Sequence, residues 1–370
     1  MNKIKKLIYI TYQTFPANTA NSIQTISNIK FLVREGIEVK LIFPLREKNS
    51  SAELNKLQRF YNFEEKFSTY GIKHRYPHGK IKYFKSIWFN LSHYLWSKNI
   101  VNKLINENRD ETFFTRSDWV AYFLAKKGAN VTFEVHQNSK VRKYILSKIS
   151  NLDNLKIIFL NENLMKQFKN VKNKIVLQNG VDNSLFSDNP KTKNNSIIFM
   201  GKFERFQETR GLTDIVKWFD NEYLKSNYIL ELIGASPEEE KKIKSLILSL
   251  NLKNNVKVTG WVERKKAIQK LEESSIGILI NSDSNSHSYL YTSPLKYFEY
   301  LYAGLKIVAV DFPSHRSLPF SEFIQFFSIH NLNSFIYAIK NTEKIKMPTQ
   351  NELYSITLEN RAKKIINFIY

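Results

Sequence analysis

Short apolar runs alternate with longer segments of helical periodicity along the first half of the chain. The runs have the length and content of buried β-strands, and they cover residues 7–12, 39–44, 112–115, 131–135, 157–160 and 175–177. Helical periodicity lies between them, as in residues 22–35 and 119–127, and Gly36 and Gly128 follow where these helices should end. This alternation predicts an α/β fold with a parallel, doubly wound sheet.

The same alternation begins again after a polar stretch, residues 187–195, which has the composition of a linker. Strand-like runs then cover residues 196–200, 229–233, 256–259 and 276–280, and helical periodicity covers residues 211–224, 237–250 and 264–273. We therefore predict two Rossmann-like domains, residues 1–188 and 189–346, followed by a C-terminal helix in residues 347–370.

A stretch beginning at Tyr291 has the pattern of a turn, a helix and a buried strand. Pro294 suits the first helical turn, Gly304 suits the position after the last turn, and residues 307–310 are apolar. The free N–H groups at such a helix start favour an anion. Glu299 lies about one and a half turns further along the helix, where its carboxylate could hold ribose hydroxyls. Together these features indicate a nucleotide-sugar site.

This stretch resembles the donor-site motif of glycosyltransferase family 4, a large family of retaining enzymes with the GT-B fold. The resemblance is to the subset with a Ser-Pro-Leu-Lys-x-x-Glu-Tyr motif, and Tyr291 stands where the family has its first motif Glu. Further matches are Asn179-Gly-Val-Asp182 with Phe186, Gly201-Lys202, and Thr259-Gly-Trp-Val262. They occur in the family's order over nearly the whole chain. They imply two domains that face each other across a ligand-binding cleft, with the last helix crossing back to the N-terminal domain.

The resemblance also implies roles for residues of the second domain. Lys202 and Arg210 would hold the donor diphosphate, because preorganised cations stabilise the charge that develops on such a leaving group. Glu299 would bind the ribose. The other donor-site candidates implied by the family motifs are Gly201, Trp261, Val262, Ser293, Pro294, Leu295 and Lys296.

Acceptor-side candidates lie in the first domain. His136 follows a predicted strand at the family position that contacts the donor sugar or the acceptor, with Glu134 beside it. A lone histidine is more often structural, so this assignment rests on the resemblance. Arg116 follows a neighbouring predicted strand. Ser22 opens the first predicted helix as a plausible N-cap, and the N–H groups at this helix start could contact an anion. The predicted catalytic residues are His136, Lys202, Arg210 and Glu299.

The 370-residue chain carries a net charge of +22, which is concentrated in its first half. Residues 1–190 hold 31 Lys and Arg against 15 Asp and Glu, and the remainder holds 25 against 19. Residues 71–105 contain seven basic residues, no acidic residue, and aromatic residues at roughly helical spacing. Such a segment suits an anionic membrane surface, and it equally suits a core-packed helix with a solvated basic face.

Composition narrows the remaining chemistry. The absence of Cys excludes disulfides, thiol nucleophiles and Cys-based zinc sites. The seven His residues are scattered without carboxylates at ligand spacing, so we predict no metal and no cofactor. No apolar run approaches the roughly 20 residues of a transmembrane helix, and the first run is shorter than the roughly 7–15 residues of a signal peptide core. We expect a cytoplasmic protein, either soluble or peripheral on the cytoplasmic membrane face.

The sequence therefore predicts a retaining, metal-independent hexosyltransferase. It would move a sugar from a nucleotide diphosphate sugar to a glycan or lipid-linked glycan acceptor in bacterial surface polysaccharide synthesis. Three alternatives stay open. A GT-B nucleotide-sugar 2-epimerase would need no acceptor, and a degenerate family member, which Tyr291 motivates, would lack turnover. A nucleic-acid-binding protein is motivated by charge alone, and its binding would weaken steeply with salt.

Overall fold

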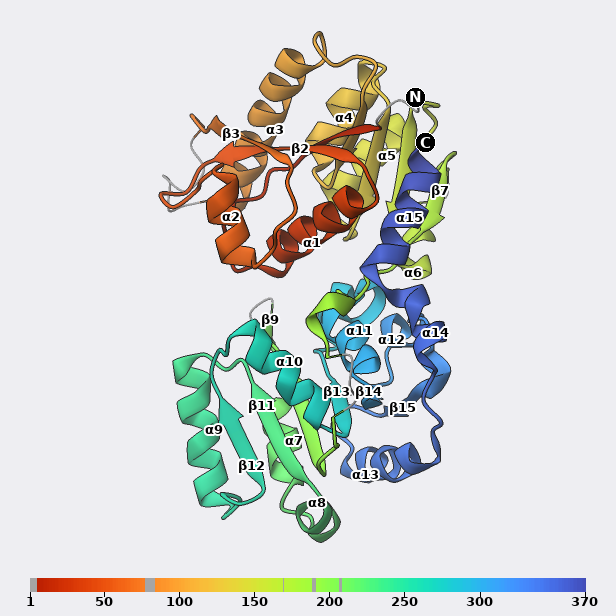
Figure 1. Cartoon of the computed structure of the whole chain (residues 1–370). Coiled ribbons are helices and arrows are strands. Elements are labelled where there is room, and N and C mark those ends of the chain that lie inside the picture. The colour runs from red at the N-terminus through yellow and green to blue at the C-terminus, as the bar shows by residue number, and fades with distance from the viewer. Residues whose placement is uncertain (1–4, 77–83, 169, 188–190, 206–207) are drawn as a thin grey trace. The chain divides into compact units, whose positions relative to one another are not determined.

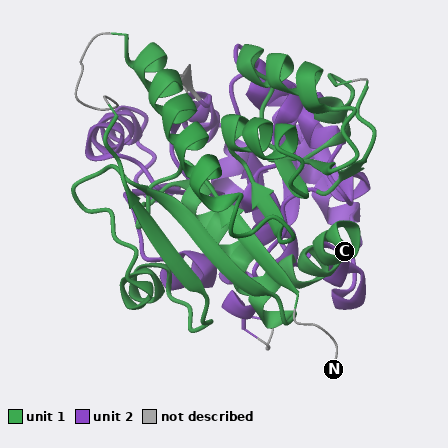
Figure 2. Cartoon of the chain, turned by 90° about the horizontal axis from the view of Figure 1, so that it is seen from above, with its two compact units in different colours: residues 1–177, 358–370 green, residues 178–357 purple. Residues whose placement is uncertain are grey.

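Two units make up the fold (Figure 2). The computed structural model describes residues 5–76, 84–168, 170–187, 191–205 and 208–370. Unit 1 contains residues 1–177 and 358–370, and unit 2 contains residues 178–357. The boundary predicted between residues 188 and 189 lies outside the described residues.

Unit 1 is built on a parallel sheet with the strand order β3-β2-β1-β4-β5-β6-β7 (Figure 1). The strands are β1 (Lys6–Ile10), β2 (Glu38–Leu45), β3 (Ser68–Lys73), β4 (Thr112–Thr115), β5 (Val131–Val135), β6 (Leu155–Phe159) and β7 (Lys174–Val176). The chain fills the sheet first from β1 toward β3 and then from β4 toward β7. Ligands of such sheets bind outside the carboxyl ends of the strands at this reversal. The predicted doubly wound sheet is confirmed.

Helices cover both faces of this sheet. They are α1 (Ala20–Arg34), α2 (Leu54–Tyr61), α3 (Lys85–Leu104), α4 (Asp118–Lys126), α5 (Lys140–Ile149), α6 (Glu162–Met165) and α15 (Leu358–Ile369). Helices α1 and α2 lie on one face and α3, α4 and α5 on the other (Figure 1). Ile26 and Ile29 of α1 share a core cluster with Ala362 and Ile365 of α15, so the last helix of the chain is part of unit 1.

Unit 2 repeats this architecture with a parallel sheet in the order β12-β11-β8-β13-β14-β15. Its strands are β8 (Ser196–Met200), β11 (Ile229–Ile233), β12 (Val256–Thr259), β13 (Ile276–Leu279), β14 (Lys306–Val310) and β15 (Ile324–Phe327). Its helices are α7 (Leu212–Trp218), α8 (Glu222–Asn227), α9 (Pro237–Ser249), α10 (Arg264–Glu273), α11 (Leu295–Tyr302), α12 (Pro313–Arg316), α13 (Leu332–Asn341) and α14 (Gln350–Leu353).

The central strand β8 shows how the core of unit 2 is divided between the two faces. Ile197 and Phe199 join the core cluster that includes α7 and α9, and Ile198 joins the cluster that includes α10 and α11. All three side chains are fully buried, and each such burial stabilises the fold by roughly 1.5–3 kcal/mol. The apolar run that predicted this strand therefore reflects burial on both faces.

Several predicted elements differ from the structure in detail. The helix predicted over residues 211–224 is two helices, because the Asn221 side chain accepts a hydrogen bond from the Tyr223 N–H (3.0 Å) and starts α8. Pro294 is the extended N-cap of α11 and does not lie in its first turn. Gly304 follows the C-cap residue with a φ of 74°, as predicted for a helix end.

The C-terminal helical segment is also interrupted. Residues 354–357 separate α14, which belongs to unit 2, from α15, which belongs to unit 1. Thr357 leads directly into α15, whose apolar face meets α1. Among the described residues, none of the helices combines the length and the apolar character that crossing a lipid bilayer requires.

Candidate functional site

In unit 2, two of the predicted cations lie beside the carboxyl end of β8. The short antiparallel ribbon of β9 (Glu204–Arg205) and β10 (Glu208–Thr209) occupies the loop after this strand. The Arg210 N–H donates to the Phe203 carbonyl at 3.2 Å, so the ribbon closes on itself. Arg210 therefore returns to the neighbourhood of the exposed Lys202, although eight positions separate them in sequence.

A third cation joins this group from α11. The Lys296 ammonium lies 3.7 Å from the centre of the Phe199 ring, and the Arg210 guanidinium carbon lies 5.9 Å from the same centre. An aromatic face attracts cations at such distances, so the ring at the end of β8 holds two positive charges in one place. This arrangement brings together Arg210 and Lys296, which the sequence placed in separate motifs.

The backbone near these cations is open to close approach by a ligand. Gly201 and Gly234 follow β8 and β11, and both have positive φ values, 133° and 105°. A Cβ at Gly234 would lie 2.8 Å from the Gly201 carbonyl oxygen. Only glycine fits this contact, and the bare peptide groups leave room for an anionic group beside the cations.

Contacts between α11 and the sheet of unit 2 place the start of this helix at the carboxyl end of β8. Tyr300 is fully buried, and its hydroxyl accepts a hydrogen bond from the Met200 N–H at 2.8 Å. A Cβ at Gly277 of β13 would lie 2.4 Å from the Tyr300 ring, so glycine there allows the helix to pack directly on the strand. Lys296, in the first turn of this helix, is consequently held at the carboxyl end of β8.

Glu299 has a partner that the sequence did not reveal. Its carboxylate is buried in α11 and forms an ion pair with the guanidinium of Arg264, the first residue of α10. The contact orients one carboxylate oxygen toward Arg264. The only sequence signal for this pair is a cation soon after the Thr259-Gly-Trp-Val262 turn.

The other donor-site candidates are placed in different ways. The Ser293 carbonyl accepts from the Asn179 side chain at 2.5 Å, and the Ser293 hydroxyl donates to Gln178 at 3.1 Å, so Ser293 ties the start of unit 2 to the segment before α11. Trp261 is 72% exposed, and Tyr291 is buried. Pro294, Leu295 and Val262 are half-buried.

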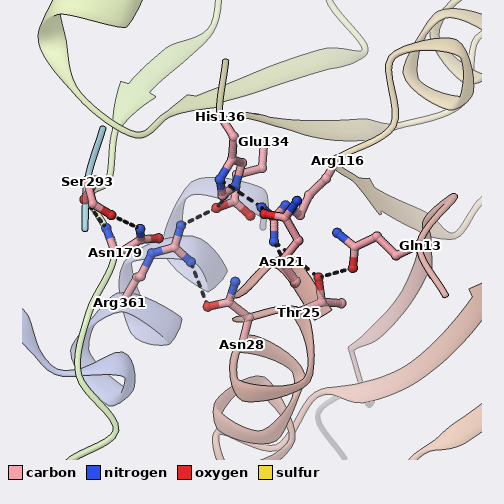
Figure 3. A network of polar contacts seen from close by, with 10 residues as sticks. All are labelled: Gln13, Asn21, Thr25, Asn28, Arg116, Glu134, His136, Asn179, Ser293 and Arg361. Atoms are coloured by element: carbon pink, nitrogen blue, oxygen red, sulfur yellow. Dashed lines mark hydrogen bonds and ion pairs between the residues drawn. The ribbon is translucent and has the colours of Figure 1, made fainter. Parts of the chain in front are cut away.

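In unit 1, three of the four acceptor-side candidates form one polar network at the ends of β4 and β5 (Figure 3). Glu134 is fully buried in β5, and one of its oxygens, Oε1, accepts from Arg361 Nη2 of α15 at 2.6 Å. His136 Nε2 lies 2.9 Å from the same oxygen. The other ring nitrogen, Nδ1, lies 2.9 Å from Arg116 Nη2. Three of the predicted residues therefore touch, and Arg361 is an unpredicted fourth member.

Charge and burial set the protonation states in this network. Burial alone would raise the pKa of the Glu134 carboxyl, but the Arg361 charge, followed by His136 and Arg116, outweighs it and holds that pKa well below its usual range. Burial, and then the Arg116 charge, lower the pKa of His136 to about 3. The network therefore contains a carboxylate, a neutral imidazole and two guanidinium groups near neutral pH.

The network reaches the start of α1. Arg116 Nη1 donates to the Asn21 carbonyl and to Thr25 Oγ1, both at 3.3 Å. Ser22 is not the N-cap that the sequence suggested: the Thr19 side chain accepts from the Ser22 N–H (3.2 Å) and caps α1. The Ser22 hydroxyl donates to the Thr14 carbonyl at 3.2 Å, so Ser22 fixes the loop after β1.

Comparisons with known proteins agree with this architecture. Residues 181–324 match the model of the family described as glycosyl transferases group 1. No curated protein matches the chain in sequence. The matched residues include all of the donor-site candidates of unit 2.

Solved structures resemble the chain over its full length. Sucrose-phosphate synthase from Thermosynechococcus elongatus is 14% identical with a TM-score of 0.71, and 98% of each chain is covered. HepE from Anabaena, solved with UDP, is 13% identical with a TM-score of 0.64, again over 98% of each chain. A mutant of TarM from S. aureus, solved with fondaparinux, α-GlcNAc-glycerol and UDP, is 11% identical with a TM-score of 0.65 over 99% of each chain.

At these identities the structural likeness establishes the fold alone, and the family match lies within the second unit. The expected GT-B architecture of two Rossmann-like domains is confirmed. The chain therefore has the GT-B fold, and its residues 181–324 are similar to the glycosyl transferases group 1 family.

Proposed function

We propose that the protein is a retaining glycosyltransferase that moves a hexose from a nucleotide diphosphate sugar to a glycan or lipid-linked glycan acceptor. The observation that carries the proposal is that two cations from separate parts of the chain meet at the Phe199 ring. Arg210 comes from the loop after β8, and Lys296 comes from the start of α11. A diphosphate leaving group requires such fixed positive charge. Bacterial surface polysaccharide synthesis is the process to which we assign this activity.

In this mechanism the residues of unit 2 bind and orient the donor. Lys202, Arg210 and Lys296 neutralise the diphosphate, and Glu299 accepts hydrogen bonds from the ribose. The acceptor oxygen forms a bond to the sugar C1 as the bond from C1 to the phosphate oxygen breaks, on the same face of the sugar. The acceptor proton passes to the departing diphosphate, so no protein base is needed. Within the described residues no three His, Asp or Glu side chains gather as metal ligands, and metal independence stays a prediction.

A ligand screen followed by product analysis tests the proposal. Nucleotides that bind the folded protein must raise its melting temperature, and we expect a shift with one base family among UDP, GDP and ADP and their sugars. UDP comes first because HepE and TarM were solved with it. The anomeric configuration of the product, read by proton NMR, should equal that of the donor. Inversion of the anomer, or free sugar released without an acceptor, would contradict the proposed reaction.

Substitution of two donor-site residues should weaken nucleotide binding. We expect Glu299→Ala to lower affinity by about ten- to a hundredfold, because a buried charged hydrogen bond is worth roughly 1.5–3 kcal/mol. Lys202→Ala, which removes an exposed cation, should lower affinity less. Isothermal titration calorimetry with the nucleotide found in the screen measures both. Lys253→Ala is the control, because this exposed lysine precedes the amino end of β12. Unchanged affinity in both variants would remove these residues from the site.

We further propose that unit 1 docks on an anionic membrane surface through the start of α3 (Figure 1). Phe84, Ile87 and Leu91 are 74%, 60% and 41% exposed, although one face of the second half of the same helix is buried. Exposed apolar residues on a strongly basic domain suit the boundary of an anionic bilayer. Part of the predicted segment, residues 77–83, lies outside the described residues.

Liposome flotation measures this docking. The protein should float with vesicles that contain anionic lipid and remain at the bottom with neutral vesicles. The double variant Ile87→Asp and Leu91→Asp should lose flotation. Leu248→Asp is the matched control, because Leu248 is an exposed leucine on α9 of unit 2. Equal failure to float on both vesicle types would rule out the membrane surface as a partner.

A further inference from the structure

The last helix of the chain contributes a charge to the acceptor-side network. Arg361 is buried in α15, and its two terminal nitrogens have different partners. Nη2 donates to Glu134 Oε1 at 2.6 Å, and Nη1 donates to Asn28 Oδ1 of α1 at 3.1 Å (Figure 3). Arg361 is thereby fixed between β5 and α1. A buried guanidinium with two separate partners defines its position more narrowly than a surface ion pair does.

The contacts of His136 determine which of its nitrogens carries the proton. Arg116 has only donors, so His136 Nδ1, 2.9 Å from Arg116 Nη2, must be the acceptor. The ring is neutral, because burial and the Arg116 charge lower the pKa of His136 to about 3. Its proton is consequently on Nε2, which lies 2.9 Å from the Glu134 carboxylate. The Glu134 carboxylate therefore favours the tautomer with its proton on Nε2, which leaves Nδ1 free to accept a hydrogen bond from Arg116.

We propose that Arg361 is a positioning residue for Arg116 and acts through Glu134 and His136. Arg361 keeps Glu134 charged, Glu134 keeps the His136 proton on Nε2, and His136 Nδ1 then holds the Arg116 guanidinium beside the start of α1. Arg116 is the last of these four side chains, and it is the one that would contact a sugar or an anionic group of a substrate. The part of this inference that is tested by enzyme activity rests on the proposed glycosyl transfer. The part that is tested by the protonation of His136 rests only on the geometry of unit 1.

Loss of Arg361 should make the network sensitive to acid. The charged groups that face His136 are Glu134, Arg116 and Arg361, and Tyr9 of β1 and Arg142 of α5 act on Arg116. Without Arg361, the buried Glu134 carboxylate needs another positive partner, and a proton on His136 supplies one. A protonated imidazole cannot accept from Arg116 and repels it. Arg361→Met should therefore add an acid limb to the pH profile of kcat/KM, with a midpoint about one pH unit or more above any in the wild type.

Two further variants separate positioning from stability. Arg361→Lys keeps a charge near Glu134 and should restore most of the wild-type pH profile. The double variant Arg361→Met and Glu134→Gln removes both charges, and the new amide oxygen can still accept the His136 proton, so it should have no acid limb. Lys364→Met is the control, because Lys364 is exposed on the same helix. A merely structural role would let activity follow melting temperature, with the same pH profile in every variant.

Nitrogen NMR of the histidine-labelled full chain provides a readout that does not need turnover. The His136 signal, assigned by its loss in His136→Gln, should show a proton on Nε2 in the wild type and a pH-dependent second proton in Arg361→Met. A wild-type proton on Nδ1 would overturn the proposal, as would a pH-independent ring in Arg361→Met. If Arg361→Met does not fold, the wild-type His136 signal still tests the proposal, because a proton on Nδ1 would overturn it. Absence of wild-type turnover with every nucleotide sugar would count against the proposed function, whereas the NMR result would still decide the positioning role.

Discussion

Substituting either Arg210 or Lys296 with Ala should lower kcat by about a hundredfold or more, which is the usual effect of removing one preorganised group that stabilises transition-state charge. Both cations lie at the Phe199 ring, where the fold positions them before any substrate arrives. Negative charge on the diphosphate grows as the sugar departs, so the loss should appear mainly in kcat and less in the affinity for the intact donor.

The double variant of Arg210 and Lys296 should lose less than the product of the two single effects. The two groups would act on one diphosphate, and residues that act as a unit are not additive. Steady-state kinetics over a range of donor concentrations measures each effect. Lys340→Met is the matched control, because Lys340 lies 4.4 Å from the Tyr223 ring on an exposed part of the same unit. Unchanged kcat in both single variants would mean that the cation pair does not contact the leaving group.

Strands that are buried on both faces could be predicted from the sequence almost to the residue. The runs at Ser196–Met200 and Ile229–Ile233 coincide with β8 and β11, because a strand covered on both faces is continuously apolar or nearly so. The edge strand β3 (Ser68–Lys73) escaped prediction. Its side chains are half-exposed or exposed, and Gly71 and Lys73 weaken the apolar pattern on which such predictions depend.

The residues of the candidate site also differ in how well the sequence predicts them. Local motifs reveal some of them, and contacts between distant parts of the chain define the others. Lys202, Arg210 and Glu299 stand in motifs whose spacing along the chain reveals them. Arg361 meets Glu134 across 227 positions, and no local pattern encodes that contact. Likewise, the sequence gives no sign that Lys296 and Arg210 meet at one aromatic ring. Residues whose role depends on a partner far along the chain become visible only when the sheets are assembled.

Acid should destabilise unit 1 more steeply than unit 2, because the units differ in buried histidines. Burial lowers the pKa of His93 and His315 to about 4, and burial followed by the Arg116 charge lowers that of His136 to about 3. Each folded pKa lies below the unfolded value of about 6.5. Each histidine therefore contributes stability that is fully present above pH 6.5 and is lost as the pH falls toward the folded value.

The expected slopes follow from the number of protons that unfolding takes up. One such histidine changes the free energy of unfolding by about 1.4 kcal/mol per pH unit between roughly pH 6 and pH 4.5. His93 and His136 belong to unit 1 and His315 belongs to unit 2, so these groups predict about 3 kcal/mol per pH unit for unit 1 and about half of that for unit 2. Hydrogen exchange read by mass spectrometry reports the two units separately, since each peptide belongs to one of them.

A single substitution can isolate one of these protons. His93 is stacked on Tyr12 with ring centres 4.5 Å apart, and His93→Phe keeps an aromatic ring there while removing the titrating group. The slope for unit 1 should then fall by about 1.4 kcal/mol per pH unit, and that for unit 2 should not change. The exposed His330 of unit 2 is the control, as His330→Gln. If His93→Phe leaves the slope for unit 1 unchanged, the buried imidazoles are not the groups through which acid destabilises this unit. The Glu134 carboxylate then becomes the next group to remove, because the Arg361 charge holds its pKa well below the usual range and its stabilising charge is also lost as the pH falls.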